Sequence, residues 1–168
     1  QSAIIRASGR GTSTWLPLLS TGTTYMLQSD ASTMISPAMF ERFVLPDLEV
    51  CCESLDHPFY HLDGPGEIRH LDHLLSLSRL RGIQWVPGAG QPPPEDWPDL
   101  LRRIRDAGKL CQVGVTPQGA LSLVRRVGGR GFYFVIHAPD GTFPDDASAL
   151  SFLDLLARED VSGARRLW

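Results

Sequence analysis

The feature that most constrains the fold of this chain is a fivefold alternation of short apolar strands with amphipathic helices. Runs with the length and apolar content of strands are expected at 24–30, 59–63, 82–86, 110–116 and 132–137. Each run is followed, after a short loop, by a segment whose apolar residues recur at helical spacing. This order is typical of a parallel sheet assembled from βαβ units, so the predicted fold class is α/β.

The start of the first helix has a clear sequence signal. Ser36 is predicted to cap a helix that has Pro37 at its first position, and Pro46 to kink or restart that helix. Further helices are expected at 67–80, 97–107, 118–127 and 145–158. Residues 1–23 are rich in Gly, Ser and Thr and are expected to be irregular, with residues 24–168 forming one domain.

Polar side chains occupy one face of several predicted strands. In one strand His61 and Asp63 alternate with Tyr60 and Leu62. In another strand Gln112 is the first residue of the polar face. A strand with helices on both sides is almost wholly apolar, whereas a barrel strand has helices on one side and polar residues near its carboxyl end. The pattern therefore favours a partial TIM (β/α) barrel of about five parallel strands, with an open α/β sheet as the alternative.

Composition excludes several classes of function. The 16 Lys+Arg are scattered among 19 Asp+Glu, so a nucleic-acid backbone is not an expected partner. The sequence has no run of about 18 apolar residues, and we therefore expect no membrane span. The adjacent Cys51 and Cys52 cannot easily bridge, and with Cys111 they form no C-x-x-C motif. We expect three reduced thiols in a cytoplasmic protein.

The segment His61-Leu62-Asp63 is the sharpest local feature. A His and a carboxylate two residues apart in a strand point to the same side, which suits two metal ligands or an oriented acid/base pair. His137 ends another strand on its polar face and is the predicted third ligand of a catalytic zinc site. The alternative is a hydrogen-bonded His at a strand end, with Asp63 bonding the turn at 64–66.

Further residues complete the predicted site. Asp30 is predicted to form a carboxylate pair with Asp63 for proton transfer, with a helix or turn cap as the alternative. Gln84, Gln112 and His137 are predicted to contact the substrate.

Two other predictions concern the surroundings of the site. Trp85, with the loop at 87–90, is predicted to form an apolar wall for a flat ligand, and the alternative is a core tryptophan. His70 and His73 flank the apolar stripe of their helix and are expected to be solvated.

Four segments, in order and spacing, resemble the uroporphyrinogen decarboxylase superfamily. They are DASTMISPAMF at 30–40, YHLDGPG at 60–66, GIQWVPGAG at 82–90, and residues 97–108 followed by a strand. The superfamily includes uroporphyrinogen decarboxylases and cobalamin-dependent methyltransferases. The resemblance covers about residues 24–158 and implies that the chain is the C-terminal part of a TIM barrel.

The resemblance also implies a function. In the methyltransferase branch, zinc is held by a His-x-Cys at a strand end and by a Cys on the last strand. His61 matches that His, Asp63 stands in place of the first Cys, and His137 lies near the last ligand. Without thiolates the zinc would be a harder, more electrophilic centre. The expected activity is zinc-assisted methyl transfer from a methylated corrinoid protein, with Asp30 and Gln112 positioning the substrate.

Two alternatives remain open. One is decarboxylation of a tetrapyrrole in porphyrin biosynthesis without a metal, with Asp30 or Asp63 supporting proton transfer. The other is an inactive, truncated paralogue that acts only as an interaction module. A closed barrel needs eight strands and roughly 250 residues, so we expect pairing with another copy or with a missing N-terminal half.

Overall fold

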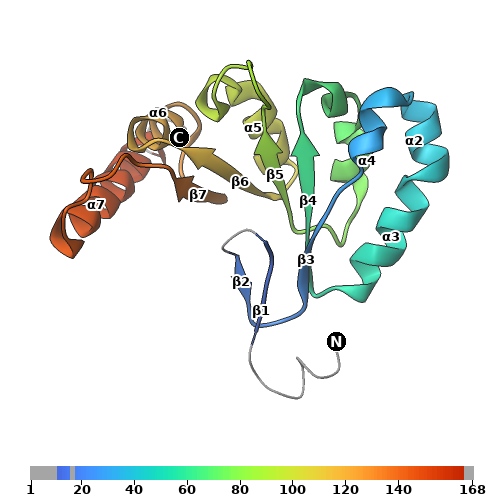
Figure 1. The fold of residues 1–168 in the computed structure, drawn as a ribbon, viewed down its shortest axis with the longest axis horizontal. Helices are drawn as coiled ribbons and strands as arrows, with labels where there is room; N and C mark the ends of the chain where they lie inside the picture. Colours follow the sequence, from blue (N-terminus) through green and yellow to red (C-terminus); the bar gives the residue numbers. More distant parts are fainter. Residues whose placement is uncertain (1–10, 16–17, 165–168) are drawn as a thin grey trace. The chain divides into compact units, whose positions relative to one another are not determined.

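A computed structural model describes residues 11–15 and 18–164, with side chains up to residue 160. The chain divides into two compact units, Gln1–Gly88 and Ala89–Trp168. In both units strands alternate with helices, and apart from the antiparallel N-terminal hairpin the strands within each unit are parallel to their neighbours (Figure 1). The predicted α/β class is therefore confirmed.

The first unit contains an N-terminal hairpin followed by three strands with intervening helices. Its described elements are β1 (Thr12–Ser13), β2 (Leu19–Ser20), β3 (Thr24–Leu27), η1 (Asp30–Met34), α2 (Pro37–Phe43), α3 (Leu45–Ser54), β4 (His57–Asp63), η2 (Pro65–His70), α4 (Leu71–Ser76) and β5 (Gly82–Val86). The β3–β4 and β4–β5 pairs are parallel. In the second pair His61 stands opposite Gln84, so two residues of the predicted site are neighbours across the sheet.

The second unit continues the alternation. Its described elements are η3 (Pro94–Asp96), α5 (Pro98–Asp106), β6 (Leu110–Val115), α6 (Pro117–Val127), β7 (Phe132–Ile136) and α7 (Asp146–Ala164). β6 and β7 form a parallel pair. The side chain of Arg125 on α6 forms an ion pair with Glu159 on α7, with the Nε and Oε2 atoms 3.0 Å apart.

The predicted helix start at Ser36 is confirmed. The Ser36 hydroxyl accepts a hydrogen bond from the Met39 N–H at 3.2 Å, and Pro37 occupies the first position of α2. The predicted restart at Pro46 is also confirmed, because α2 ends at Phe43 and α3 has this proline in its first turn. A proline in the first turn leaves no hydrogen bond unmade, since the first N–H groups of a helix have no partner within it.

Several segments differ from the expectations, including β4, which begins at His57 rather than at residue 59, and α7, which ends at Ala164 rather than at residue 158. β3 ends at Leu27 rather than at residue 30, because the chain turns into η1, where the Ser32 N–H donates to Ser29 O at 2.8 Å. The helix expected over 67–80 is divided into a 3-10 helix and α4. The segment expected to be irregular contains the β1–β2 hairpin, although residues 1–10 and 16–17 lie outside the described part.

The hairpin is attached to β3 by side-chain hydrogen bonds. The Thr12 hydroxyl donates to Gly22 O at 2.6 Å and accepts from the Thr24 N–H at 2.8 Å. The Asp56 carboxylate, just before β4, accepts from the N–H and the hydroxyl of Thr23 at 2.8 and 2.9 Å. These contacts hold the residues that precede β3 against the start of β4.

All three cysteines are free thiols in the structure. Cys52 and Cys111 are buried, Cys51 is half-buried, and burial raises the pKa of the Cys111 thiol. Among the described helices, none is long and apolar enough to cross a membrane.

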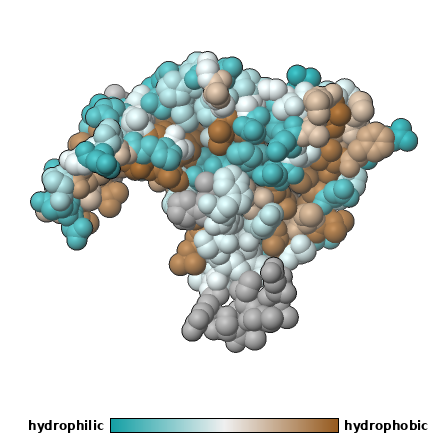
Figure 2. All heavy atoms as spheres, in the orientation of Figure 1, coloured by the Kyte–Doolittle hydropathy of each residue, from teal (hydrophilic) through white to brown (hydrophobic). Residues whose placement is uncertain are grey.

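Apolar side chains are also exposed on the first unit. Figure 2 shows hydrophobic residues on the surface over α2 and α3, and Met39, Phe43 and Val50 are the large exposed side chains of these helices. In the second unit every residue of β7, an apolar strand, is half-exposed. Apolar strands of this kind favour pairing with another chain.

Candidate functional site

A hydrogen bond between neighbouring strands orients the histidine at the centre of the predicted site. His61 on β4 and Gln84 on β5 are register partners, and His61 Nδ1 lies 2.5 Å from Gln84 Oε1. The amide oxygen only accepts, so Nδ1 carries the proton and donates. In the neutral imidazole Nε2 then keeps a free lone pair, which is the form that binds a metal or accepts a proton.

Asp63 lies on the same face of β4 as His61, two residues along. Its side chain is exposed, and within the described chain its carboxylate accepts no hydrogen bond. The Asp63 N–H, in contrast, donates to Glu67 Oε2 at 3.2 Å. The turn that follows is thus held through the main chain, and the carboxylate itself is available to a ligand.

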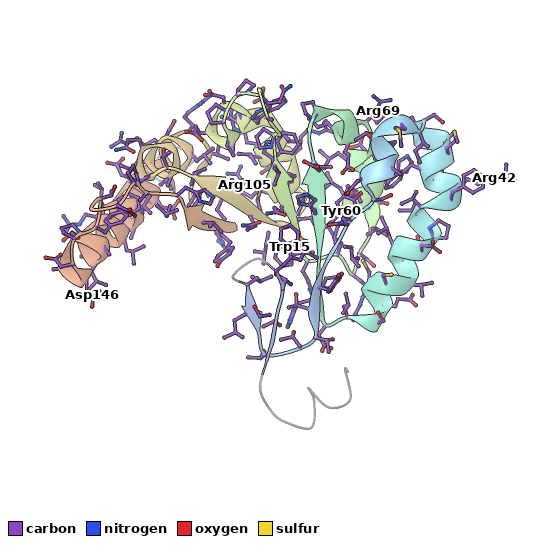
Figure 3. The ribbon with its side chains drawn as sticks, viewed as in Figure 1. Trp15, Arg42, Tyr60, Arg69, Arg105 and Asp146 are labelled. Carbon is purple, nitrogen blue, oxygen red and sulfur yellow. The ribbon has the colours of Figure 1, made fainter. Side chains whose placement is uncertain are left out.

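Trp15, a residue that the sequence did not predict to be part of the site, contacts His61. The Trp15 ring meets the imidazole edge to face, with the ring centroids 5.4 Å apart and the planes at 77°. Trp15 is 57% exposed, and Figure 3 labels it together with Tyr60 of β4. No pattern in the sequence indicated this contact, because Trp15 lies in the segment that was expected to be irregular.

Trp15 also borders an open cavity of about 520 Å³ beside β3. The floor is formed by β3 and α3 side chains, including Met26 and Leu48, and the rim includes the exposed rings of Tyr25 and Phe43. Gln28 and Ser29 line it where β3 ends. The cavity thus joins an aromatic rim to the carboxyl end of a parallel strand, where α/β folds bind ligands.

Beneath the exposed residues lies a buried polar cluster, which we call the Glu67 cluster: Ser32, Tyr60, Glu67 and His70. Glu67 Oε1 accepts a hydrogen bond from the Ser32 hydroxyl at 3.0 Å, and the Glu67 side chain is only 1% exposed. The Ser32 carbonyl accepts from His70 Nε2 at 2.9 Å. The sequence contains only a weak indication of this cluster. Glu67 comes two residues after the Gly64-Pro65 turn, a position that is typical of an acidic residue at the start of a helix.

Burial controls the titration of this cluster. Desolvation raises the pKa of the Glu67 carboxyl, and the nearby charges of Asp30 and Asp63 raise it further, against two hydrogen bonds that lower it. Desolvation also raises the pKa of the Tyr60 phenol, and the charge of Glu67 adds to this effect. Asp30 and Asp63, the predicted carboxylate pair, are therefore both within electrostatic reach of Glu67.

The expectation that His70 is solvated is wrong. His70 is fully buried, and its ring stacks on Phe40 with centroids 4.4 Å apart and planes at 11°. Its Nε2 donates to Ser32 O, so Nδ1 is deprotonated, and no described residue hydrogen-bonds to that atom. Desolvation lowers the pKa of His70, and the charges of Arg69 and His73 act in the same direction.

The lowered pKa of His70 predicts sensitivity to acid. As the pH falls below about 6.5, the unfolded chain takes up a proton at this position before the folded chain does, so the free energy of unfolding decreases by up to about 1.4 kcal/mol per pH unit. His70→Gln keeps a donor for Ser32 O but does not titrate. Urea unfolding between pH 7 and 5 should show a shallower pH dependence in this variant; an unchanged slope would contradict the interpretation.

The second unit contains the remaining predicted substrate contacts. Gln112 on β6 is 2% exposed, and its Oε1 is buried without a hydrogen-bond partner among the described residues. His137 follows β7, where its N–H donates to Val115 O at 2.8 Å. A Cβ at Gly114 would lie 2.6 Å from His137 Nε2, so the missing side chain of Gly114 makes room for the imidazole over β6. Gln112 and Gly114 share one face of β6.

Two predicted residues lie away from the His61 face of the first unit. Trp85 is fully buried and stands opposite Leu62, on the other side of β5 from Gln84. Asp30 is exposed at the start of η1 and is not on a strand. The structure therefore brings His61, Asp63 and Gln84 together on one face and places Trp85 in the core.

Within the described residues, no group of three or more His, Cys, Asp or Glu side chains is arranged to hold a metal ion. His61 and Asp63 belong to the first unit and His137 to the second, and their joint role as zinc ligands stays a prediction. Comparison with protein-family models, with curated proteins and with solved structures found no match to this chain.

Proposed function

We propose that this chain contributes a catalytic site to an enzyme of the uroporphyrinogen decarboxylase type, centred on His61. The observation that carries the proposal is the hydrogen bond from His61 Nδ1 to Gln84 Oε1, which fixes the ring and leaves Nε2 free. A neighbouring carboxylate on the same strand face, Asp63, has no competing hydrogen bond among the described residues. Orientation of a histidine through its second nitrogen is a common feature of metal-binding and acid–base sites.

The leading reaction is zinc-assisted methyl transfer. His61 Nε2 and the Asp63 carboxylate fit two positions of such a site, and Gln84 supplies the outer hydrogen bond that metal-bound histidines usually make. Zinc held by nitrogen and oxygen ligands acts as a Lewis acid, which would polarise the methyl acceptor. His137 as third ligand and a methylated corrinoid protein as methyl donor remain predictions from the resemblance.

The second candidate is decarboxylation of a tetrapyrrole without a metal. It is favoured by the exposed Asp63 carboxylate on the same strand face as His61. In this reaction a proton must replace the lost carboxylate, and His61 with Asp63 forms a pair that can deliver it. Asp30 or Asp63 would be the supporting carboxylate, as the sequence predicts.

We also propose the finer features of the predicted architecture and setting. The two units would form the C-terminal part of a TIM barrel, completed by another copy or by a separate N-terminal half. The exposed apolar side chains of α2, α3 and β7 support such an association. The three free cysteines support a reducing, cytoplasmic location.

Zinc content tests the leading proposal. The purified chain should retain about one zinc per chain after dialysis against zinc-free buffer, and His61→Ala should hold less than about 0.1. Gln84→Leu keeps His61 but loses the oxygen that orients it, so zinc affinity should fall by about 10–100-fold. His73→Ala removes a histidine of α4 outside the site and serves as the control, with unchanged zinc content.

The outcomes separate the candidates. A wild-type chain without zinc, or a His61→Ala variant with wild-type zinc content, would exclude the metal-assisted reaction. Turnover of uroporphyrinogen by the zinc-free protein, lost in His61→Ala, would then establish the decarboxylase. Loss of both properties would leave the interaction module.

A further inference from the structure

One buried carboxylate connects the two segments that carry the predicted catalytic carboxylates. Glu67 Oε2 accepts from the Asp63 N–H at the end of β4, and Oε1 accepts from the Ser32 hydroxyl in η1. The Asp63 and Asp30 side chains themselves are exposed and make no described contact that would fix them. In contrast, Glu67 holds the Asp63 main chain directly and the η1 segment through the Ser32 side chain.

We infer that Glu67 is the positioning residue of the His61 site. By bonding the Asp63 N–H it sets the backbone of that residue, and with it the direction in which the Asp63 carboxylate points beside His61. This inference deepens the proposed function and rests on it. Glu67 does not reach a ligand itself, because its side chain is almost completely buried.

The geometry favours a positioning role over a role for charge. In the described part of the chain no Arg or Lys pairs with Glu67, and the ionised form is penalised by burial. The side chain contributes two oxygens, separated as in a carboxyl or a carboxamide, that face a main-chain N–H and a hydroxyl. A shorter acid cannot reach both donors, whereas an amide of the same length can accept from the N–H and donate to the hydroxyl.

The η1 segment is fixed by the same cluster. The Ser32 hydroxyl is held by Glu67, and the Ser32 carbonyl by His70 Nε2. Ser32 lies two residues after Asp30 in the same 3-10 turn, so anchoring Ser32 restricts the main chain that carries Asp30. The Glu67 cluster therefore places both predicted carboxylates relative to β4.

Two matched substitutions of Glu67 distinguish the effect of its side-chain length from the effect of its charge. Glu67→Gln keeps the length and removes the charge, and Glu67→Asp keeps the charge and shortens the side chain by one methylene. We expect Glu67→Gln to retain zinc affinity within about threefold, and Glu67→Asp to weaken it by about tenfold or more. Leu74→Val, in the core of α4, controls for a general loss of stability and should leave zinc affinity unchanged.

Amide hydrogen exchange measures the hydrogen bond from the Asp63 N–H to Glu67 without any metal. Exchange at the Asp63 N–H should become at least about tenfold faster in Glu67→Asp and stay close to wild type in Glu67→Gln. If the wild-type chain binds no zinc, the metal-assisted reaction is excluded, but the exchange rates still decide the role of Glu67. The inference would be overturned if the Asp63 N–H exchanged at the same rate in Glu67→Asp as in the wild type. It would also be overturned if Glu67→Gln accelerated this exchange as much as Glu67→Asp does.

Discussion

Trp85→Ala is expected to lower the free energy of unfolding by about 3–5 kcal/mol, because it removes the largest fully buried side chain of the first unit. The indole lies on β5 opposite Leu62, on the face of the strand away from His61 and Gln84. Alanine would leave a cavity on that face of the sheet, among side chains that are already close-packed. Urea unfolding followed by circular dichroism measures the loss.

A tryptophan that is exposed provides the matched control. Trp15 is 57% exposed, and Trp15→Ala should change stability by no more than about 0.5 kcal/mol. Trp85→Phe separates the two interpretations of this residue: a core tryptophan predicts lower stability with zinc binding retained. Normal stability with lost ligand binding would instead support the apolar wall that the sequence suggested.

The strands could be predicted from sequence because each is a short apolar run between turn residues. β5 has the predicted bounds, and β6 and β7 differ by a single residue at their ends. β3 is shorter than predicted because Gln28 and Asp30 continue the polar alternation beyond the point where the chain turns. An alternating pattern does not mark where the main chain leaves the sheet.

The buried polar residues were harder to predict. Glu67 and His70 were placed on a regular helix of 3.6 residues per turn, whereas they lie in a 3-10 helix with three residues per turn. Glu67 and His70, three residues apart, lie on one side of this helix and both are buried, so His70 stacks on Phe40 instead of facing solvent. The face shared by His61 and Asp63 was predictable because alternation in a strand depends only on the parity of the residue number.

The pairing of β4 with β5 depends on a glycine. Gly82 stands opposite Phe59, and a Cβ at that position would lie 2.6 Å from the Phe59 Cζ atom. The Phe59 ring is buried and cannot move aside freely, so Gly82→Ala should cost about 1–3 kcal/mol of unfolding free energy. Gln84 follows two residues later, and displacement of β5 would also lengthen its hydrogen bond to His61.

The lengthening of the His61–Gln84 hydrogen bond in Gly82→Ala can be measured separately from the loss of stability. Imidazole nitrogen chemical shifts report which His61 nitrogen carries the proton, and Gly82→Ala should reduce the fraction protonated at Nδ1. Phe59→Leu makes room for the added methyl group, so the double variant should be less destabilised than the sum of the single changes. Additive losses, or a Gly82→Ala chain within about 0.5 kcal/mol of wild type, would show that the close approach of β4 and β5 at Gly82 does not maintain the His61–Gln84 contact.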